Sequence, residues 1–285
     1  MNFLTKAIQM SKAKILYVSQ EIDPFLPETI ISRISRNLPQ GIHEKGKEIR
    51  VFTPRFGKIN ERRHQLHEVI RLSGMNLIIN DTDHPLIIKV ASIPTARMQV
   101  YFIDNEEYFK RKSALTDDKG VLHPDNDERS IFFIRGVMET VKKLGWVPDV
   151  IHCHGSMTAM LPVYIKSFYN NDPHFANAKV VYSVYDNEFE GSLNPALIDK
   201  IAFDGIQKES VSVVQDPTFV NLTKLAIQYS DGIVVGSSDI DPELRSAIAS
   251  SDVPSIESYV EDNFVGEISS FYDSILEGKS ILVEE

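Results

Sequence analysis

The stretch Lys14–Thr53, KILYVSQEIDPFLPETIISRISRNLPQGIHEKGKEIRVFT, decides the fold class of this chain. It opens and closes with short β-branched runs, KILYVS (Lys14–Ser19) and EIRVFT (Glu48–Thr53), which are typical of buried strands. Between them, from Glu28 to Lys45, apolar residues recur at helical spacing before Gly46 ends the predicted helix. The recurring residues are Ile30, Ile31, Ile34, Leu38 and Ile42. The pattern predicts a βαβ unit with parallel strands.

The rest of the chain keeps this alternation. Three strand-like runs, NLIIN, PLIIKV and QVYFID, lie between Glu68 and Asp104 without an intervening helix, which predicts an antiparallel insertion or edge. A polar loop is expected at Ser113–Asp127. Beyond it we expect helices at 128–144, 156–168 and 217–229, strands at 149–153, 179–185 and 232–236, and helices to the end. We therefore predict an α/β fold: one Rossmann-like domain, 1–285, whose mostly parallel sheet has helices on both faces.

Composition narrows the function classes. The 285 residues contain 30 Lys and Arg against 40 Asp and Glu, and the resulting net charge of −10 would repel a nucleic-acid backbone. We expect no nucleic-acid partner. No apolar run reaches the roughly 18 residues of a membrane span, so no membrane partner is expected either. The single cysteine, Cys153, cannot form an internal disulfide, which fits a cytoplasmic protein.

Ligands of parallel sheets bind beyond the carboxyl ends of the strands, so three loops form the candidate site. These are Gln20–Ile31 (QEIDPFLPETII), His154–Thr158 (HGSMT) and Asp186–Glu190 (DNEFE). His152 and His154 share one face of a strand and could suggest zinc. Because no third or fourth ligand follows at ligand spacing, we expect no metal.

The carboxylates of the third loop allow another interpretation. Asp186, Glu188 and Glu190 could supply an acid–base pair for glycosidic bond hydrolysis. Such a reaction also needs two carboxylates at a defined separation, and charged clusters in loops are more often simply solvated. Hydrolysis is therefore the weaker hypothesis.

A collinear set of motifs resembles the bacterial glycogen synthases and plant starch synthases of glycosyltransferase family 5. The motifs are Glu21, Pro24 and Phe25 after the first strand, YFIDNEEYF (Tyr101–Phe109), Asp125, Asn126 and Arg129, LGWVPDVIHCH (Leu144–His154) and YSDGIVVGSS (Tyr229–Ser238). The resemblance covers roughly Lys14 to Leu244 and implies the N-terminal Rossmann-like half of a GT-B fold. It also implies glucosyl transfer from ADP-glucose to an α-1,4-glucan, without a further cofactor. Since Glu285 lies about where the donor-binding half would begin, we expect the C-terminal GT-B domain to be absent.

The first site loop departs from the family pattern. Active members carry Lys-Thr-Gly-Gly-Leu, in which glycines let the backbone approach the donor diphosphate and lysine supplies a cation. The matching positions here are Pro27, Glu28, Thr29, Ile30 and Ile31. Proline lacks an N–H, and Glu28 places a negative charge where phosphate would lie. Both Thr29 and Ile30 are β-branched and resist positive φ.

The other two loops also lack the expected polar groups. Where the family has His-x-His-Asp-Trp, this chain continues from His154 into Gly155 and Ser156, so the carboxylate is missing. Where the family has Thr-x-His-Asn, the chain has Tyr185 and Asp186 in place of the last two residues. We assign no catalytic residue. The expected degenerate substrate cleft consists of Pro27, Glu28, Thr29, Ile30, His154, Gly155, Tyr185 and Asp186.

Two function hypotheses follow. The first is a catalytically degenerate glycosyltransferase domain that is retained to bind a glucan or a partner. The alternative is an active glucosyltransferase completed by a separate C-terminal donor-binding subunit. Expected partners are therefore an α-glucan or a weakly bound nucleotide-sugar, a separate C-terminal domain protein, or a second copy of the chain. Self-association would use the apolar cleft residues Phe25, Leu26, Ile30 and Met157.

Overall fold

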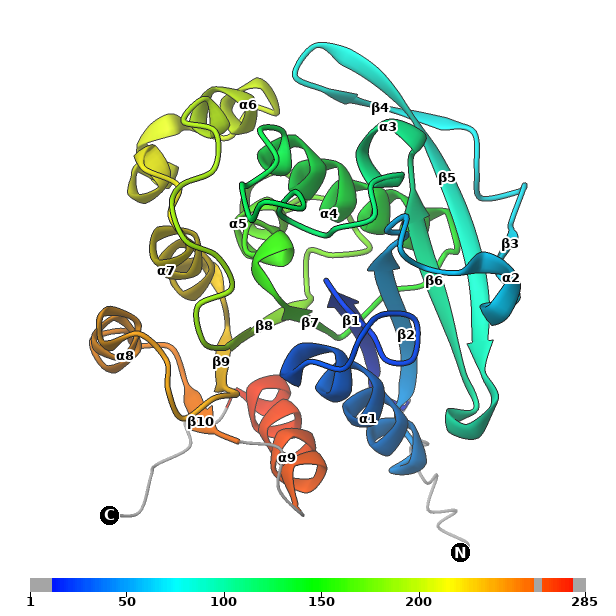
Figure 1. Cartoon of the computed structure of the whole chain (residues 1–285). Helices are drawn as coiled ribbons and strands as arrows, with labels where there is room; N and C mark the ends of the chain where they lie inside the picture. The colour runs from blue at the N-terminus through cyan, green and yellow to red at the C-terminus, as the bar shows by residue number, and fades with distance from the viewer. Residues whose placement is uncertain (1–11, 259–262, 279–285) are drawn as a thin grey trace, which may run out of the picture.

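A ten-stranded sheet organises the chain, whose computed structural model describes residues 12–258 and 263–278 (Figure 1). The strands are β1 (Lys14–Ser19), β2 (Glu48–Pro54), β3 (His67–Glu68), β4 (Met75–Ile79), β5 (Thr82–Ile93), β6 (Met98–Asp104), β7 (Val150–His154), β8 (Lys179–Val184), β9 (Gly232–Val235) and β10 (Ser255–Glu257). Their order is β10-β9-β8-β7-β1-β2-β6-β5-β3, with β4 paired to β5.

Helices connect and cover the strands. They are α1 (Ile30–Glu44), α2 (Glu61–His64), α3 (Glu106–Phe109), α4 (Asn126–Lys143), α5 (Leu161–Ser167), α6 (Leu197–Phe203), α7 (Phe219–Tyr229), α8 (Pro242–Ala249) and α9 (Phe264–Glu277). Three 3-10 helices are η1 (Pro94–Ala96), η2 (Ser156–Thr158) and η3 (Lys208–Gln215). Within the described ranges, no helix is long and apolar enough to cross a membrane.

The sheet is parallel from β10 to β6, as the βαβ pattern predicted. Strand β5 breaks the pattern, because it runs antiparallel to β3, β4 and β6. This confirms the antiparallel insertion expected between Glu68 and Asp104. Asn80 and Asp81 turn the β4–β5 hairpin with φ of 47° and 62°, a conformation that Asn and Asp tolerate better than most residues.

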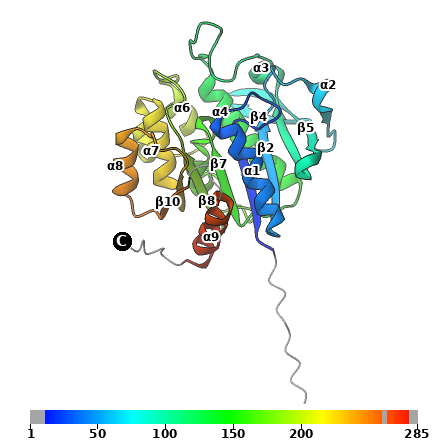
Figure 2. The ribbon, with the colours of Figure 1, turned by 60° about the horizontal axis from the view of Figure 1, so that its bottom comes forward.

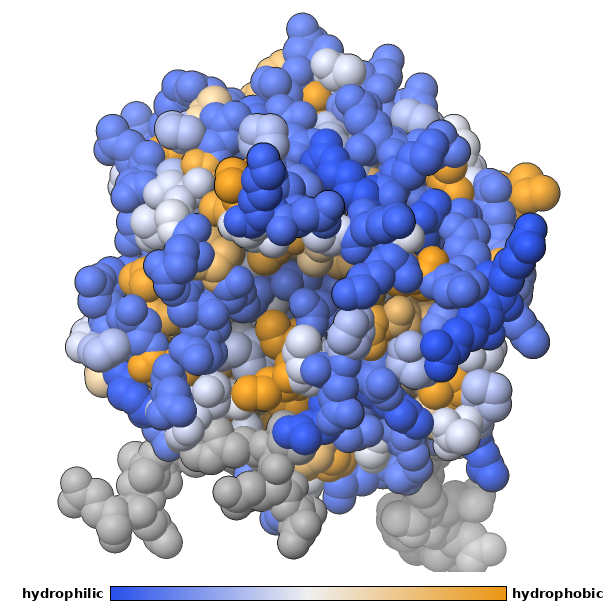
Figure 3. Space-filling model, in the orientation of Figure 1, coloured by the Kyte–Doolittle hydropathy of each residue, from blue (hydrophilic) through white to orange (hydrophobic). Residues whose placement is uncertain are grey.

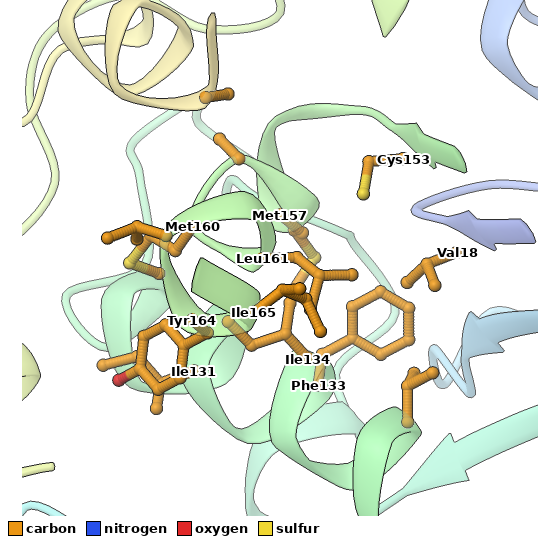
Figure 4. Close-up of a cluster of buried hydrophobic side chains, with 14 of the residues drawn as sticks. Val18, Ile131, Phe133, Ile134, Cys153, Met157, Met160, Leu161, Tyr164 and Ile165 are labelled. Carbon is orange, nitrogen blue, oxygen red and sulfur yellow. The ribbon is translucent and has the colours of Figure 1, made fainter. Parts of the chain in front are cut away.

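Each face of the sheet carries its own core, which confirms helices on both sides (Figures 1 and 2). Along β1, Leu16 and Val18 join the core under α4 and α5, whereas Ile15 and Tyr17 join the core under α1 and α9. This alternation follows from the two-residue period of a strand. Figure 4 shows part of the first core, where Val18 and Cys153 of neighbouring strands meet side chains of α4, η2 and α5.

The structure differs from the sequence-based expectation at one helix and at one sheet edge, among other places. The helix expected at 156–168 is instead η2 followed by α5, and Pro162 lies in the first turn of α5. Because proline has no N–H to donate to the preceding turn, a continuous helix through this position is unfavourable. The short edge strand β10 was not expected, since its three residues lack a recognisable period.

Candidate ligand site at the strand ends

A cavity of about 400 Å³ opens at the carboxyl ends of β1 and β2. Its lining comes from the loop after β1 (Glu21, Leu26, Pro27, Thr29), the segment after β2 (Phe56, Lys58) and the segment after α3 (Lys112, Ser113, Ala114, Asp118). The volume lies within the range of small-molecule pockets. Apolar, hydroxyl, ammonium and carboxylate groups all face this cavity, so it offers both hydrogen-bonding groups and apolar surface to a ligand.

Thr29 connects this cavity to the first turn of α1. Its hydroxyl accepts a hydrogen bond from Ser32 N at 3.0 Å, while Ser32 Oγ accepts one from Thr29 N at 2.8 Å. This reciprocal capping box satisfies N–H groups that a phosphate-binding helix would direct at its ligand. The Thr29 hydroxyl also donates to Glu21 Oε2 at 2.7 Å. The loop therefore presents the Glu21 carboxylate to the cavity. The capped N–H groups at the start of α1 are hydrogen-bonded within the chain and are not available to a ligand.

Glu28 and Ile30 are not among the residues that line the cavity. Glu28 is exposed and lies 3.7 Å from Arg33, a distance at which a solvated pair contributes little stability. Ile30 is 44% exposed. Of the four cleft positions expected in this loop, the structure thus brings only Pro27 and Thr29 to the cavity.

The end of β7 is filled rather than open. Gly155 is buried at φ +91°, and a Cβ added there would lie 2.7 Å from Gln20 Cβ. Gln20 Oε1 in turn accepts hydrogen bonds from Met157 N at 3.0 Å and from Ser156 Oγ at 3.2 Å. Both the backbone conformation and the contact therefore favour glycine at position 155.

Histidine and tyrosine side chains form a buried network beside this loop. His152 is hydrogen-bonded to Tyr272 Oη at 2.5 Å and to Ser183 Oγ at 2.8 Å, and His154 Nδ1 to Tyr185 Oη at 2.7 Å. Burial lowers the pKa of His152 well below its usual value and that of His154 to about 3. Both imidazoles are thus neutral near pH 7 and do not face the cavity.

No three His, Cys, Asp or Glu side chains gather as a metal-binding group in the part of the chain that the structure describes. Both ring nitrogens of His152 already have hydroxyl partners. His154 Nε2 is buried without a hydrogen-bond partner, and Cys153 points into the opposite core. The His-x-His pair therefore has the surroundings of a packed core rather than those of a zinc site.

The third loop contains one carboxylate that is not simply solvated. Both oxygens of Glu188 lie 3.0 Å from Ser156 N, and burial together with the Glu21 charge raises the pKa of Glu188 to about 7. Asp186 is exposed and accepts a hydrogen bond from the neighbouring Asn187 N at 2.7 Å. The expectation of a uniformly solvated cluster is therefore wrong for Glu188 and fits Asp186.

The apolar cleft surface expected for self-association is mostly covered. Phe25 and Met157 are 5% and 1% exposed, Leu26 is partly buried, and only Ile30 faces solvent. On the side shown in Figure 3, apolar side chains appear as small groups among hydrophilic ones. The apolar surface that the sequence suggested for a homodimer is therefore mostly unavailable for contact with a second copy.

Several residues at these strand ends escaped sequence reasoning. Lys58 and Lys112 line the cavity, and neither lies in the three loops expected to form the site. A signal existed for Lys58, because it follows the carboxyl end of a strand expected in the parallel sheet. No local pattern marks Lys112, which comes from a loop after the antiparallel insertion.

Comparison with known proteins gives this geometry a family context. A family model described as the starch synthase catalytic domain matches residues 14–252. The glycogen synthase of Chlorobaculum parvum is 33% identical over 238 residues, which cover 82% of this chain and 47% of that protein. The glycogen synthase of Chlorobium limicola is 38% identical over 189 residues, which cover 66% of this chain and 39% of that protein. The chain thus spans less than half the length of these relatives.

Among solved structures, the catalytic domain of starch synthase IV from Arabidopsis thaliana, bound to ADP and acarbose, is similar. The TM-score is 0.66 at 17% identity, over 80% of this chain and 45% of that chain. At such low identity the likeness concerns the fold alone. It agrees with the expected Rossmann-like half of a GT-B enzyme.

Proposed function

The chain belongs to the starch synthase catalytic domain family, and from this premise we propose that it is a catalytically degenerate member retained to bind a sugar or glucan. Family members transfer glucose from ADP-glucose to an α-1,4-glucan. We propose that this chain no longer transfers glucose from a donor but still binds carbohydrate.

The contact between Gly155 and Gln20 carries the proposal. Restoring the family's aspartate at position 155 would place a Cβ 2.7 Å from Gln20 Cβ on a backbone with φ of +91°. Such a position disfavours every residue except glycine. The surrounding loop is thus packed around the missing carboxylate, which supports a loss of catalysis that a single substitution back to aspartate would not reverse.

The loop after β1 supports the same proposal. It offers no cation to a diphosphate, and its exposed Glu28 would repel one. The capping box between Thr29 and Ser32 satisfies N–H groups at the start of α1. Tyr185 is 4% exposed and hydrogen-bonded to His154, so its hydroxyl has no access to a donor sugar.

Carbohydrate binding is favoured over self-association. The cavity combines the partly exposed apolar surface of Leu26 with the hydroxyls of Thr29 and Ser113, a mixture that suits the C–H faces and hydroxyls of sugars. We expect millimolar dissociation constants, about −4 kcal/mol, because a few hydrogen bonds and one apolar contact supply the affinity.

An isotope-transfer assay tests the loss of catalysis. Purified protein, radiolabelled ADP-glucose or UDP-glucose and glycogen should give no incorporation above a heat-killed control. Incorporation by the protein alone would contradict the proposal. Incorporation that appears only when a separate C-terminal donor-binding protein is added would instead establish the two-subunit alternative.

A further inference from the structure

Two lysines face the cavity without a counter-ion. Lys58 and Lys112 line it, and within residues 12–258 and 263–278 neither side chain forms a hydrogen bond or ion pair. By contrast, the neighbouring Arg111 holds Asp125 through two hydrogen bonds of 2.5 and 2.6 Å. An unpaired ammonium group in a pocket is available for an anionic ligand.

The backbone fixes the segments that carry these lysines. Gly57 N donates to Arg111 O at 2.8 Å, which joins the segment after β2 to the segment after α3. A Cβ at Gly57 would lie 1.9 Å from Lys110 O, so this approach requires glycine. Lys58 and Lys112 each follow one residue of this hydrogen-bonded pair, and the contact therefore positions both lysines at one wall of the cavity.

A buried guanidinium group adds positive charge behind this wall. Arg129 is 0% exposed and lies over the rings of Phe56 and Phe109 at 5.7 and 5.6 Å. It donates to Ala114 O at 2.6 Å, but its Nη2 has no hydrogen-bond partner. Among the described residues, no carboxylate forms an ion pair with Arg129. Because Phe56 and Ala114 both line the cavity, the Arg129 charge, which no carboxylate contacts directly, lies behind this wall.

Two carboxylates line the same cavity. Glu21 Oε2 accepts the Thr29 hydroxyl at 2.7 Å and the carboxylate retains a second oxygen, and Asp118 also lines the cavity. Carboxylates of this kind accept hydrogen bonds from sugar hydroxyls. They would repel a second acidic group, so a ligand with a single acidic group, bound by the lysines, fits this mixture of charges best.

We propose that the cavity binds a hexose carrying one acidic group, a phosphate or a carboxylate, which contacts Lys58 and Lys112. The hydroxyls of the sugar face Glu21 and Thr29, and its apolar face lies against Leu26. The inference rests on the proposed carbohydrate-binding function and narrows its ligand class. In this inference the anion binds at the two lysines and not at the first turn of α1, because that turn is capped by its own side chains.

Protein-observed NMR titrations test this ligand class. The probes are glucose 1-phosphate, glucuronate, glucose, inorganic phosphate and maltoheptaose. We expect glucose 1-phosphate or glucuronate to bind about tenfold more tightly than glucose and than phosphate alone. The stronger of the two acidic sugars identifies the anion. If both bind no better than glucose, the inference is wrong.

Substitutions then locate the anion contact. The double variant Lys58→Gln/Lys112→Gln should lose about tenfold in affinity for the acidic sugar and retain its affinity for glucose. Lys45→Gln, at the far end of α1, is the matched control and should bind like the wild type. Unchanged affinity in the double variant would overturn the inference. The maltoheptaose titration and the transfer assay test the proposed function independently of the lysines. A failure of the acidic-sugar inference can therefore be told apart from a failure of the proposed function.

Discussion

The ends of β7 and β8 differ from the ends of β1 and β2, although both belong to the edge where a parallel sheet binds ligands. Beside β7, Gln20 and Gly155 are in close contact and His154 and Tyr185 are hydrogen-bonded within the core. Beside β1 and β2, a cavity of about 400 Å³ remains, lined by charged and hydroxyl groups. The fold alone therefore does not keep a site open. Local side-chain packing decides which strand ends can receive a ligand.

The largest expected effect concerns Gly155. Gly155→Ala should lower the free energy of unfolding by about 2–4 kcal/mol, because strain at positive φ and a 2.7 Å contact with Gln20 Cβ add together. Gly120→Ala is the matched control, since Gly120 has φ +80° and nothing within 4 Å of an added Cβ. Urea denaturation of both variants measures the difference. Equal losses would mean that the β7 end has room for a side chain.

The second prediction tests the buried network. Tyr272→Phe should lower the free energy of unfolding by about 1–3 kcal/mol, because it removes the partner of His152 Nδ1 and a 3.3 Å hydrogen bond to Tyr17 Oη. Tyr229→Phe removes a partly buried 2.9 Å hydrogen bond to Ser210 O and should cost less, about 0.5–1 kcal/mol. Thermal and urea unfolding of the two variants compare them. A larger loss for Tyr229→Phe would contradict a well-satisfied network beside β7.

A pH dependence should arise from Glu188, which lies between the two regions. Its pKa rises from 4.5 to about 7 on folding, so the folded state favours the protonated carboxyl group. The stabilisation is fully present below pH 4.5 and is lost as the pH rises through about 7. We expect a loss of about 1–2 kcal/mol, less than the full shift implies, because part of the residue faces solvent.

The variant Glu188→Gln should remove this dependence. Its unfolding free energy relative to the wild type should increase between pH 4.5 and 7, the range given by the pKa shift. Glu190→Gln, an exposed carboxylate in the same loop, is the control and should show a smaller change. Parallel denaturation series at several pH values provide the measurement. If Glu188→Gln follows the wild type at every pH, the carboxylate is solvated after all.

The smallest effect on stability is expected in the open region. Lys58→Gln/Lys112→Gln should change the free energy of unfolding by less than about 0.5 kcal/mol, since both side chains are exposed and unpaired among the described residues. A loss of several kcal/mol would show that the lysines stabilise the fold and are not reserved for a ligand. The two regions would then differ less than the structure indicates.

Periodicity was sufficient to predict the mostly parallel sheet and its two covered faces. The βαβ pattern of Lys14–Thr53 and the strand-like runs between Glu68 and Asp104 are local features, so they can be recognised in a single sequence. The break at Pro162 was readable in the same way but was missed, since the apolar residues on either side continue the helical spacing.

Long-range contacts account for what the sequence could not predict. Gln20 meets Gly155 across 135 residues, and Gly57 meets Arg111 through one backbone hydrogen bond. Neither contact leaves a period or a motif in the chain. The cavity residue Lys112 was therefore invisible before the fold was known, and the cleft expected around Gly155 and Tyr185 could not be recognised as packed.

One measurement tests the contrast between the two regions most directly. Amide chemical shifts of the ¹⁵N-labelled protein are recorded during titration with glucose 1-phosphate and, separately, ADP-glucose. We predict that glucose 1-phosphate shifts amides around the cavity, at Glu21, Thr29 and Ala114, and that neither ligand shifts Gly155 or Tyr185. Saturable shifts at Gly155 and Tyr185 with ADP-glucose would contradict the account, because the β7 end would then open and still bind a donor.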